Sequence, residues 1–153
     1  MSHPYPPHLA TFNYVGRYHY ALTFGTNARR AVFVDTEVMT LVLTQILRAS
    51  SETRFALTAY CFMPDHLHLI VQGKADDSDC KAFIKSAKQY SGYYYKQAHE
   101  QRLWQRYGHE RVIRNDQELA MTVRYVIANP VRAGLVGHPR DYALLGSEVY
   151  TVE

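Results

Sequence analysis

The sequence predicts a single α+β domain in which an antiparallel, ferredoxin-like sheet carries helices packed on one face. Three observations support this fold class. The chain has 153 residues, which suits one domain with its own core. Its residues are 47% hydrophobic and 20% charged, a composition that excludes disordered, collagen-like and coiled-coil chains. Segments with strand and helix patterns follow in the order strand, helix, strand, strand, helix, strand, which is typical of a ferredoxin-like sandwich.

The first part of the chain predicts a strand followed by a helix. Residues 14–24 are rich in Tyr, Val and Thr with rough alternation, so they favour an opening strand. Asp35 or Thr36 then caps a helix whose apolar residues recur at helical spacing to about Ala49. We expect Ser50 and Ser51 to break this helix.

A hairpin follows the first helix. Residues 54–62 have the pattern of a second strand, and residues 66–72 have the pattern of a third strand that runs back against it. Residues 63–65, Met-Pro-Asp, form the tight turn between the two strands.

The second half of the chain repeats the alternation of helix and strand. A polar loop over 73–79 precedes a long helix from Lys81 to about Ala98, and residues 112–113 suit a short fourth strand. Asn115 is a good N-cap with Glu118 three residues later, and its helix is expected to run until Pro130 stops it. We therefore expect one domain over 1–153, with an N-terminal segment at 1–12, a core at 13–143 and a tail at 144–153.

The sequence predicts a cytoplasmic protein. Its longest apolar runs, such as residues 60–63, are far below the roughly 18 residues of a membrane span. The N-terminus lacks the basic and apolar regions of a secretory signal. Cys61 and Cys80 are too few for a disulfide scaffold, which suits a reducing compartment.

Positive charge gathers in one stretch of the chain. Residues 81–114 contain eight Lys and Arg against two Glu, with aromatic residues between them. Basic side chains that follow a phosphate backbone and rings that stack on bases are typical of single-stranded nucleic-acid binding. A solvated basic helix with a few core aromatics is the alternative. The predicted DNA contacts, in this stretch and beyond it, are Lys81, Lys85, Lys88, Lys96, Arg102, Trp104, Arg106, Arg114 and Arg132.

A pair of histidines lies on the predicted third strand. Because side chains alternate across a strand, His66 and His68 project from one face while Leu67 projects from the other. Two imidazoles at this spacing can bind one cation, with oxygen ligands completing its shell. Two surface histidines are the alternative. A structural zinc site is disfavoured because no second pair of Cys or His ligands is evident.

One tyrosine stands out on the last predicted helix. Tyr125 lies off the apolar stripe of this helix, and Asn129 lies four residues later on the same face. A phenol and a carboxamide therefore lie next to each other near the helix end. A tyrosine packed against a neighbouring element is the alternative for Tyr125.

Three segments together resemble the single-tyrosine transposases that carry an HUH motif, in which a bulky hydrophobic residue separates two histidines. Residues 63–71 (MPDHLHLIV) resemble the HUH motif, and residues 103–107 (LWQRY) and 125–136 (YVIANPVRAGLV) resemble the two other signatures of this group. The last signature is similar to that of the REP-associated tyrosine transposases, relatives of the insertion sequence 200/605 transposases. The resemblance covers residues 14 to 142.

The resemblance implies a homodimer with the HUH transposase fold that cuts and rejoins single-stranded DNA next to hairpins formed by repetitive extragenic palindromes (REP). It implies metal ligation by His66 and His68, a nucleophilic Tyr125 and a third metal ligand in Asn129. Members of the classical mobile branch of the family have Gln at this last position, and the shorter Asn still offers a carbonyl oxygen that suits Mg²⁺ or Mn²⁺. Asp65 precedes the first histidine and is a candidate for a residue that orients a metal ligand without binding the metal itself.

The chemistry expected from this resemblance is metal-dependent strand cleavage with a 5′-phosphotyrosine intermediate. Two alternatives stay open. One is a non-catalytic protein of the same fold that binds single-stranded nucleic acid. The other is a metal-dependent hydrolytic nuclease, in which water cuts the strand and no protein adduct forms.

Overall fold

The computed structural model describes residues 12–149. Five strands, three α-helices and two short 3-10 helices follow one another along this part of the chain. In chain order they are β1 (His19–Gly25), η2 (Asn27–Arg29), α1 (Thr36–Thr53), β2 (Phe55–Met63), β3 (His66–Gly73), α2 (Cys80–His99), β4 (His109–Val112), α3 (Asp116–Arg132), η3 (Pro139–Asp141) and β5 (Leu145–Gly146).

The strands form one antiparallel sheet in the order β4-β1-β3-β2-β5. Its first four strands have the ferredoxin-like order, so the predicted α+β class and sheet are confirmed. β3 lies at the centre and pairs with β1 on one side and with β2 on the other. In that register Thr23 of β1 lies opposite His68 of β3.

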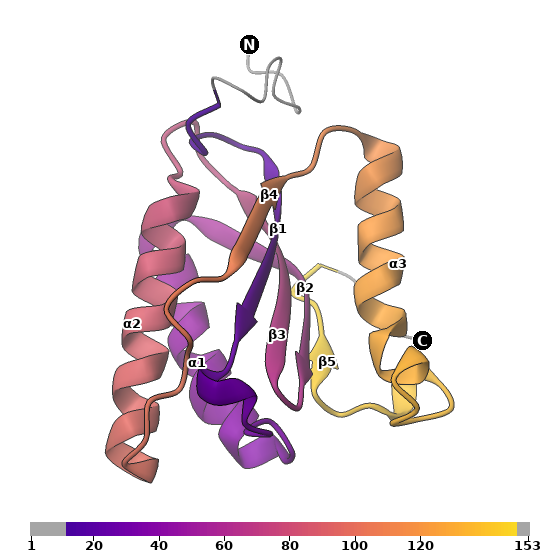
Figure 1. Cartoon of the computed structure of the whole chain (residues 1–153). Helices are drawn as coiled ribbons and strands as arrows, with labels where there is room; N and C mark the ends of the chain where they lie inside the picture. Colours follow the sequence, from indigo (N-terminus) through magenta and orange to yellow (C-terminus); the bar gives the residue numbers. More distant parts are fainter. Residues whose placement is uncertain (1–11, 150–153) are drawn as a thin grey trace.

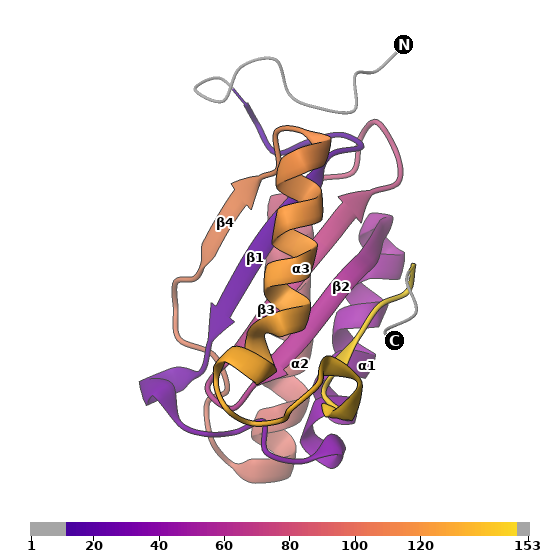
Figure 2. The same cartoon turned by 90° about the vertical axis from the view of Figure 1, so that its right-hand side faces the viewer.

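The helices cover both faces of the sheet, so the expectation that they pack on one face is wrong for α3. Figure 1 shows α1 and α2 on one side and α3 on the other, and Figure 2 shows α3 lying across the sheet. The reason lies in the central strands, which are apolar on both faces. Leu67 and Leu69 join the core under α1 and α2, whereas Ile70 joins a second core with Val126 of α3.

The helix α1 continues through the two serines that were expected to break it. Its N-cap is Asp35, one of the two predicted candidates, which accepts a hydrogen bond from the Val38 amide at 3.0 Å. Ser50 is tolerated because its hydroxyl donates to the carbonyl of Leu47 at 2.8 Å inside the helix. The helix ends instead at Arg54, which has a left-handed conformation with φ 59°.

The helix α3 also passes its expected end, because Pro130 lies inside it. The proline removes only one amide donor, and the helix continues for two more residues. Gly134, with φ +76°, provides the stop. Its amide donates to Val131 and the next amide, of Leu135, donates to Pro130, which is a Schellman arrangement. The predicted N-cap is confirmed, since Asn115 accepts from the Glu118 amide at 2.8 Å.

The two ends of the core differ from the predicted ones. β1 begins at His19 rather than at residue 14, because Tyr14 and Gly16 both have positive φ. The fold also extends past residue 143, since Leu144 is buried and β5 pairs with β2. Residues 1–11 of the expected N-terminal segment and 150–153 of the expected tail lie outside the described residues.

Among residues 12–149, no helix is both long enough and apolar enough to cross a membrane.

Close packing at the end of β3 leaves no room for a side chain at Gly73, so a substitution there should reduce the stability of the protein. A Cβ there would lie 1.9 Å from the backbone oxygen of Gly16 and 3.1 Å from the Ser78 Cβ, so the backbone would have to move. We expect Gly73→Ala to lower the free energy of unfolding by about 1–3 kcal/mol in urea denaturation. Gly137→Ala is the matched control, because a Cβ there meets nothing within 4 Å. Equal stability of the two variants would contradict the packing described here.

Candidate active site

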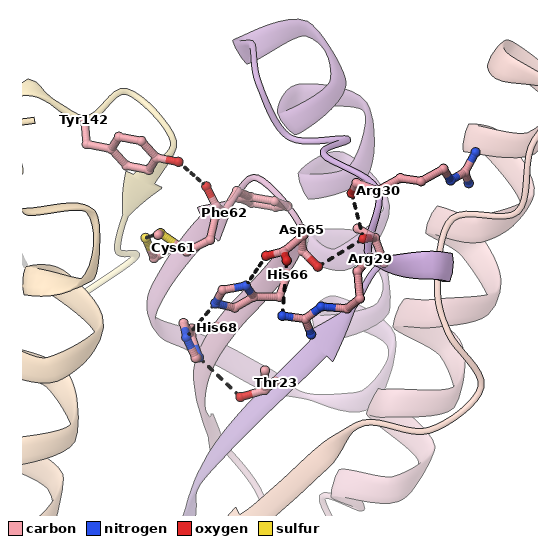
Figure 3. Close-up of polar contacts among 11 residues, drawn as sticks. Thr23, Arg29, Arg30, Cys61, Phe62, Asp65, His66, His68 and Tyr142 are labelled. Atoms are coloured by element: carbon pink, nitrogen blue, oxygen red, sulfur yellow. Dashed lines mark hydrogen bonds and ion pairs between the residues drawn. The ribbon is translucent and has the colours of Figure 1, made fainter. Parts of the chain in front are cut away.

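Two imidazoles of β3 meet on the side of the sheet that faces α3. His66 and His68 are two residues apart on the strand and project from the same face, whereas Leu67 is buried in the opposite core. Their Nε2 atoms lie 3.1 Å apart. Figure 3 shows the two rings directed toward one another. The prediction that both rings face one spot is confirmed.

The turn between β2 and β3 holds His66 in place. Asp65 in this turn lies with Oδ1 2.7 Å from the His66 Nδ1. Its other carboxylate oxygen pairs with Arg29 at 3.1 Å, and its carbonyl accepts from the Thr26 hydroxyl at 3.0 Å. These contacts fix the carboxylate, which in turn fixes the orientation of the imidazole (Figure 3).

The neighbouring strand β1 holds His68. The Thr23 hydroxyl lies 3.2 Å from the His68 Nδ1, and the two residues are register partners in the sheet. Both histidines therefore use Nδ1 for an outer contact and direct Nε2 into the space between them. In the tautomer in which each Nδ1 is protonated, two Nε2 lone pairs face each other, an arrangement that a proton or a cation between them stabilises.

The electrostatics of the site favour neutral imidazole at His68. Burial lowers the pKa of His68 to about 4, and the charges of His66 and Arg132 act in the same direction. Burial alone would raise the pKa of Asp65, but its hydrogen bond to His66 and the charge of Arg29 together lower that pKa. Asp65 is therefore an anion at neutral pH, and its carboxylate accepts a hydrogen bond from the Nδ1–H of His66.

The donor set fits a divalent cation. Two nitrogen ligands about 2.1 Å from an ion and at right angles to each other would lie about 3.0 Å apart, close to the observed separation. In the described part of the chain, no group of three or more His, Cys, Asp or Glu side chains surrounds one point. A cation held by the two imidazoles would take its further ligands from other groups, such as carboxamide, water or substrate oxygens.

Tyr125 of α3 lies beside the histidine pair. Its ring centroid is 6.2 Å from that of His68, and the rings are nearly perpendicular. The guanidinium carbon of Arg132 lies 3.8 Å from the centroid of the Tyr125 ring. The side chain is 56% exposed because the apolar stripe of α3 buries the adjacent Val126 instead. The phenol is thus accessible and has a cation over its ring.

The third predicted ligand is not brought to the pair by any described contact. Asn129 is half-buried, one helical turn after Tyr125. Its side chain makes no hydrogen bond with any residue of 12–149, although its carbonyl accepts from Ala133. Metal ligation by Asn129 stays a prediction.

A cavity of about 370 Å³ connects His68 to the tyrosine. It lies between α3 and the strands β1, β3 and β4, and its lining includes Thr23, His68 and Tyr125. Arg111 and Thr122 lie at its boundary and are joined by a hydrogen bond of 3.2 Å. The cavity gives a substrate access to both the phenol and the imidazole.

The predicted DNA-contacting residues are spread over several surfaces. Lys88, Lys96, Arg102 and Arg106 line one cavity of about 380 Å³ beside α2. Lys81 and Lys85 are exposed on the same helix. Arg114 is exposed and lies 3.8 Å from the Glu118 carboxylate, and Arg132 belongs to the tyrosine site.

The prediction that Trp104 contacts DNA is corrected by the structure. Its side chain is only 4% exposed and packs at a tilt against Phe33 and edge-on against Phe24. Its indole N–H donates to the Ser91 hydroxyl at 2.8 Å. The ring is part of the core and is not available for stacking with a base.

Sequence reasoning missed three residues that organise the site. Thr23 becomes recognisable only once the register of β1 against β3 is known. Arg29 has a left-handed conformation in the connection after β1, and no sequence pattern marks its approach to Asp65. Arg111 was counted only as one basic residue of a cluster, although it links β4 to α3 by an ion pair with Glu118.

Comparison with known proteins identifies the relatives of this chain. The model of a family described as "Transposase IS200 like" matches residues 14–129, which is more than half of the chain. A curated protein of Haemophilus influenzae, assigned as a REP-associated tyrosine transposase, is 29% identical over 107 residues. That match covers 58% of this chain and 56% of the relative, so the chain spans about half of the relative's length.

Two solved structures share the fold. A REP-associated tyrosine transposase bound to a REP hairpin matches with a TM-score of 0.75 and 23% identity, covering 95% of this chain and 82% of that one. A protein of Deinococcus radiodurans assigned as a transposase matches with a TM-score of 0.57 and 23% identity, covering 75% and 92%. These likenesses confirm the fold expected from the resemblance.

The site predicts an unusual titration of His68. Because its folded-state pKa of about 4 lies below the value of 6.5 for a free histidine, the unfolded chain binds this proton more readily. The free energy of unfolding is therefore not reduced by this group above pH 6.5, and it decreases as the pH falls from 6.5 toward 4. In metal-free protein we expect the ring signals of His68, assigned with a His68→Asn variant, to titrate by NMR with a midpoint near pH 4. A midpoint near 6.5 would show that the ring is solvated.

Proposed function

Since the chain belongs to the IS200-like transposase family, we propose that it is a metal-dependent transposase that cleaves and rejoins single-stranded DNA through a 5′-phosphotyrosine. The observation that carries the proposal is the juxtaposition of a paired imidazole site with an accessible phenol. The His66 and His68 Nε2 atoms are 3.1 Å apart, and the Tyr125 ring lies beside His68.

In this proposal His66 and His68 hold Mg²⁺ or Mn²⁺, and Asn129 supplies a third ligand. The bound ion would act as a Lewis acid on a non-bridging oxygen of the scissile phosphate. Asp65 and Thr23 keep both Nε2 atoms directed at the ion by occupying the two Nδ1 atoms. The low pKa of His68 supports this role, because a neutral imidazole binds a cation without first losing a proton.

Tyr125 is the proposed nucleophile. Its phenolic oxygen attacks the scissile phosphorus, forming the Oη–P bond while the bond from phosphorus to the 3′ oxygen breaks. The phenolic proton passes to solvent and the departing 3′ oxygen takes up a proton, so a free 3′-OH and a 5′-phosphotyrosine result. Attack by another 3′-OH reverses the step and joins strands without ATP.

Arg132 assists this step by its position over the tyrosine ring. Its guanidinium carbon lies 3.8 Å from the ring centroid, where a cation stabilises the negative charge that develops on the phenol as the proton leaves. Arg132 is exposed, so the same guanidinium can also approach the phosphate.

We propose a DNA hairpin, such as a REP-like palindrome, as the partner. Of the two solved structures described above, the one with the TM-score of 0.75 contains a bound REP hairpin. In this chain the cavity beside α2 offers four basic side chains, of which Lys88 and Arg102 are held by backbone carbonyls. Such a surface suits a phosphate backbone. A homodimer is also part of the proposal, and sedimentation of the free protein would test it.

The nucleophile assignment predicts a protein–DNA adduct that depends on one oxygen atom. Purified protein incubated with Mn²⁺ and a labelled hairpin strand from beside its own gene should give a label at protein mass on a denaturing gel. Tyr125→Phe keeps the ring but removes the attacking oxygen, so adduct formation should fall by more than about a thousandfold. Tyr94→Phe, an exposed tyrosine of α2, should form the adduct normally.

The same gel, run beside a native gel-shift assay for binding, separates this proposal from its alternatives. Cleavage of the strand without a shift in mass would support the hydrolytic nuclease. Binding that survives chelation and Tyr125→Phe, with neither cleavage nor adduct in the unmodified protein, would support the non-catalytic binder.

The proposed metal site predicts an effect of the carboxylate behind His66. Asp65→Asn keeps the size of the side chain but removes the anion that holds Nδ1–H, so Mn²⁺ affinity measured by calorimetry should fall about 10- to 100-fold. Asp76→Asn is the control, since this exposed carboxylate pairs with Arg17. Unchanged affinity in Asp65→Asn would contradict the role given to this carboxylate in holding His66 for the ion.

A further inference from the structure

A second and larger cavity adjoins the tyrosine on the side away from the helix end. Its volume is about 540 Å³, within the range of small-molecule sites. It lies along the N-terminal half of α3 and shares Arg111, Thr122 and Tyr125 with the cavity that contains His68. The two cavities therefore meet at the Tyr125 side chain. A strand whose phosphate lies at the phenol has its neighbouring nucleotide within reach of this second cavity.

The wall of the second cavity is one face of a helix. Glu118, Met121 and Tyr125 lie three and four residues apart and therefore align along α3. Met121 is 55% exposed and Tyr125 is 56% exposed, so an apolar thioether and an aromatic ring lie side by side in solvent. These two side chains offer a flat, polarisable surface of the kind on which a base can stack.

The charges in this cavity disfavour a phosphate. Its only arginine, Arg111, is already paired with the Glu118 carboxylate and donates to the Thr122 hydroxyl at 3.2 Å. Arg114, just outside it, lies 3.8 Å from the same carboxylate. A negatively charged group entering here would meet Glu118 and no unpaired cation of the lining. A neutral ligand suits the cavity better.

The rim supplies groups that match the edge of a base. Gln117 is exposed, and its carboxamide makes no hydrogen bond with any described residue. Asn115 uses its side-chain oxygen to cap the helix, and its NH₂ group, a donor, has no hydrogen-bond partner among the described residues. Carboxamides offer a donor and an acceptor together, and in protein–DNA complexes they pair with base edges.

We propose that this cavity binds one unpaired nucleobase of the DNA strand, next to the scissile phosphate. The base stacks on Met121 beside the Tyr125 ring, and Gln117 contacts its edge. The inference rests on the proposed function, because it assumes that the strand reaches Tyr125. It assigns the choice of cleavage position in part to α3, rather than to the hairpin alone.

The test uses binding rather than cleavage. Tyr125→Phe protein is mixed with the hairpin strand carrying the fluorescent base 2-aminopurine at each unpaired flanking position in turn. We expect stacking to quench the fluorescence at one or two positions next to the cleavage site. Adding Met121→Ala should remove this quenching and weaken binding about tenfold. An abasic nucleotide at the same position should weaken Tyr125→Phe binding as much, and weaken the double variant no further.

The control is Arg124→Gln in the same Tyr125→Phe background, since Arg124 is an exposed residue of α3 that lines neither cavity. It should leave the quenching at the sensitive position unchanged. Quenching that persists in the Met121→Ala variant, or that is equal at every position, would overturn the base pocket. Failure of the proposed function has a different signature: unmodified protein would form no tyrosine adduct, even if position-specific quenching were observed.

Discussion

The site depends on the register of the central strand β3. Leu67, Leu69 and Val71 are almost fully buried under α1 and α2, and this burial determines which face of the strand His66 and His68 occupy. A slip of one residue would turn both imidazoles into the core under α1 and α2 and remove Leu67, Leu69 and Val71 from it, so the register is strongly fixed. The same register places Thr23 opposite His68. The hydrophobic core thereby directs a polar pair whose Nε2 atoms meet.

The opposite face of the sheet provides the rest of the chemistry through α3. Burial of Val126 against Ile70 in the smaller core leaves the preceding side chain, Tyr125, at the border of the helix and beside His68. Arg132 follows two turns later and returns over the phenol ring. One amphipathic helix packed on this sheet face therefore places the phenol and the guanidinium beside an imidazole of β3, and its N-terminal half lines the adjoining cavity.

Local sequence patterns predicted the parts that depend on neighbours in the chain. The alternation of a strand predicted the histidine pair, and the caps at Asp35 and Asn115 were found as expected. What failed depends on tertiary packing. The indole of Trp104 became core, Pro130 was accommodated before the stop at Gly134, and α3 packed on the second face because β3 is apolar on both sides. Thr23 and β5 join the fold through long-range strand pairing, which no local pattern reveals.

The central claim is that the oxygen of Tyr125 attacks the DNA strand, and peptide mapping of the trapped adduct tests it most directly. Trypsin cleaves after Arg124 and Arg132, so Tyr125 is the only tyrosine of the peptide YVIANPVR. After nuclease trimming, mass spectrometry should find a nucleotide attached to this peptide through its 5′ phosphate. The modification on a peptide that carries another of the thirteen tyrosines would contradict the account.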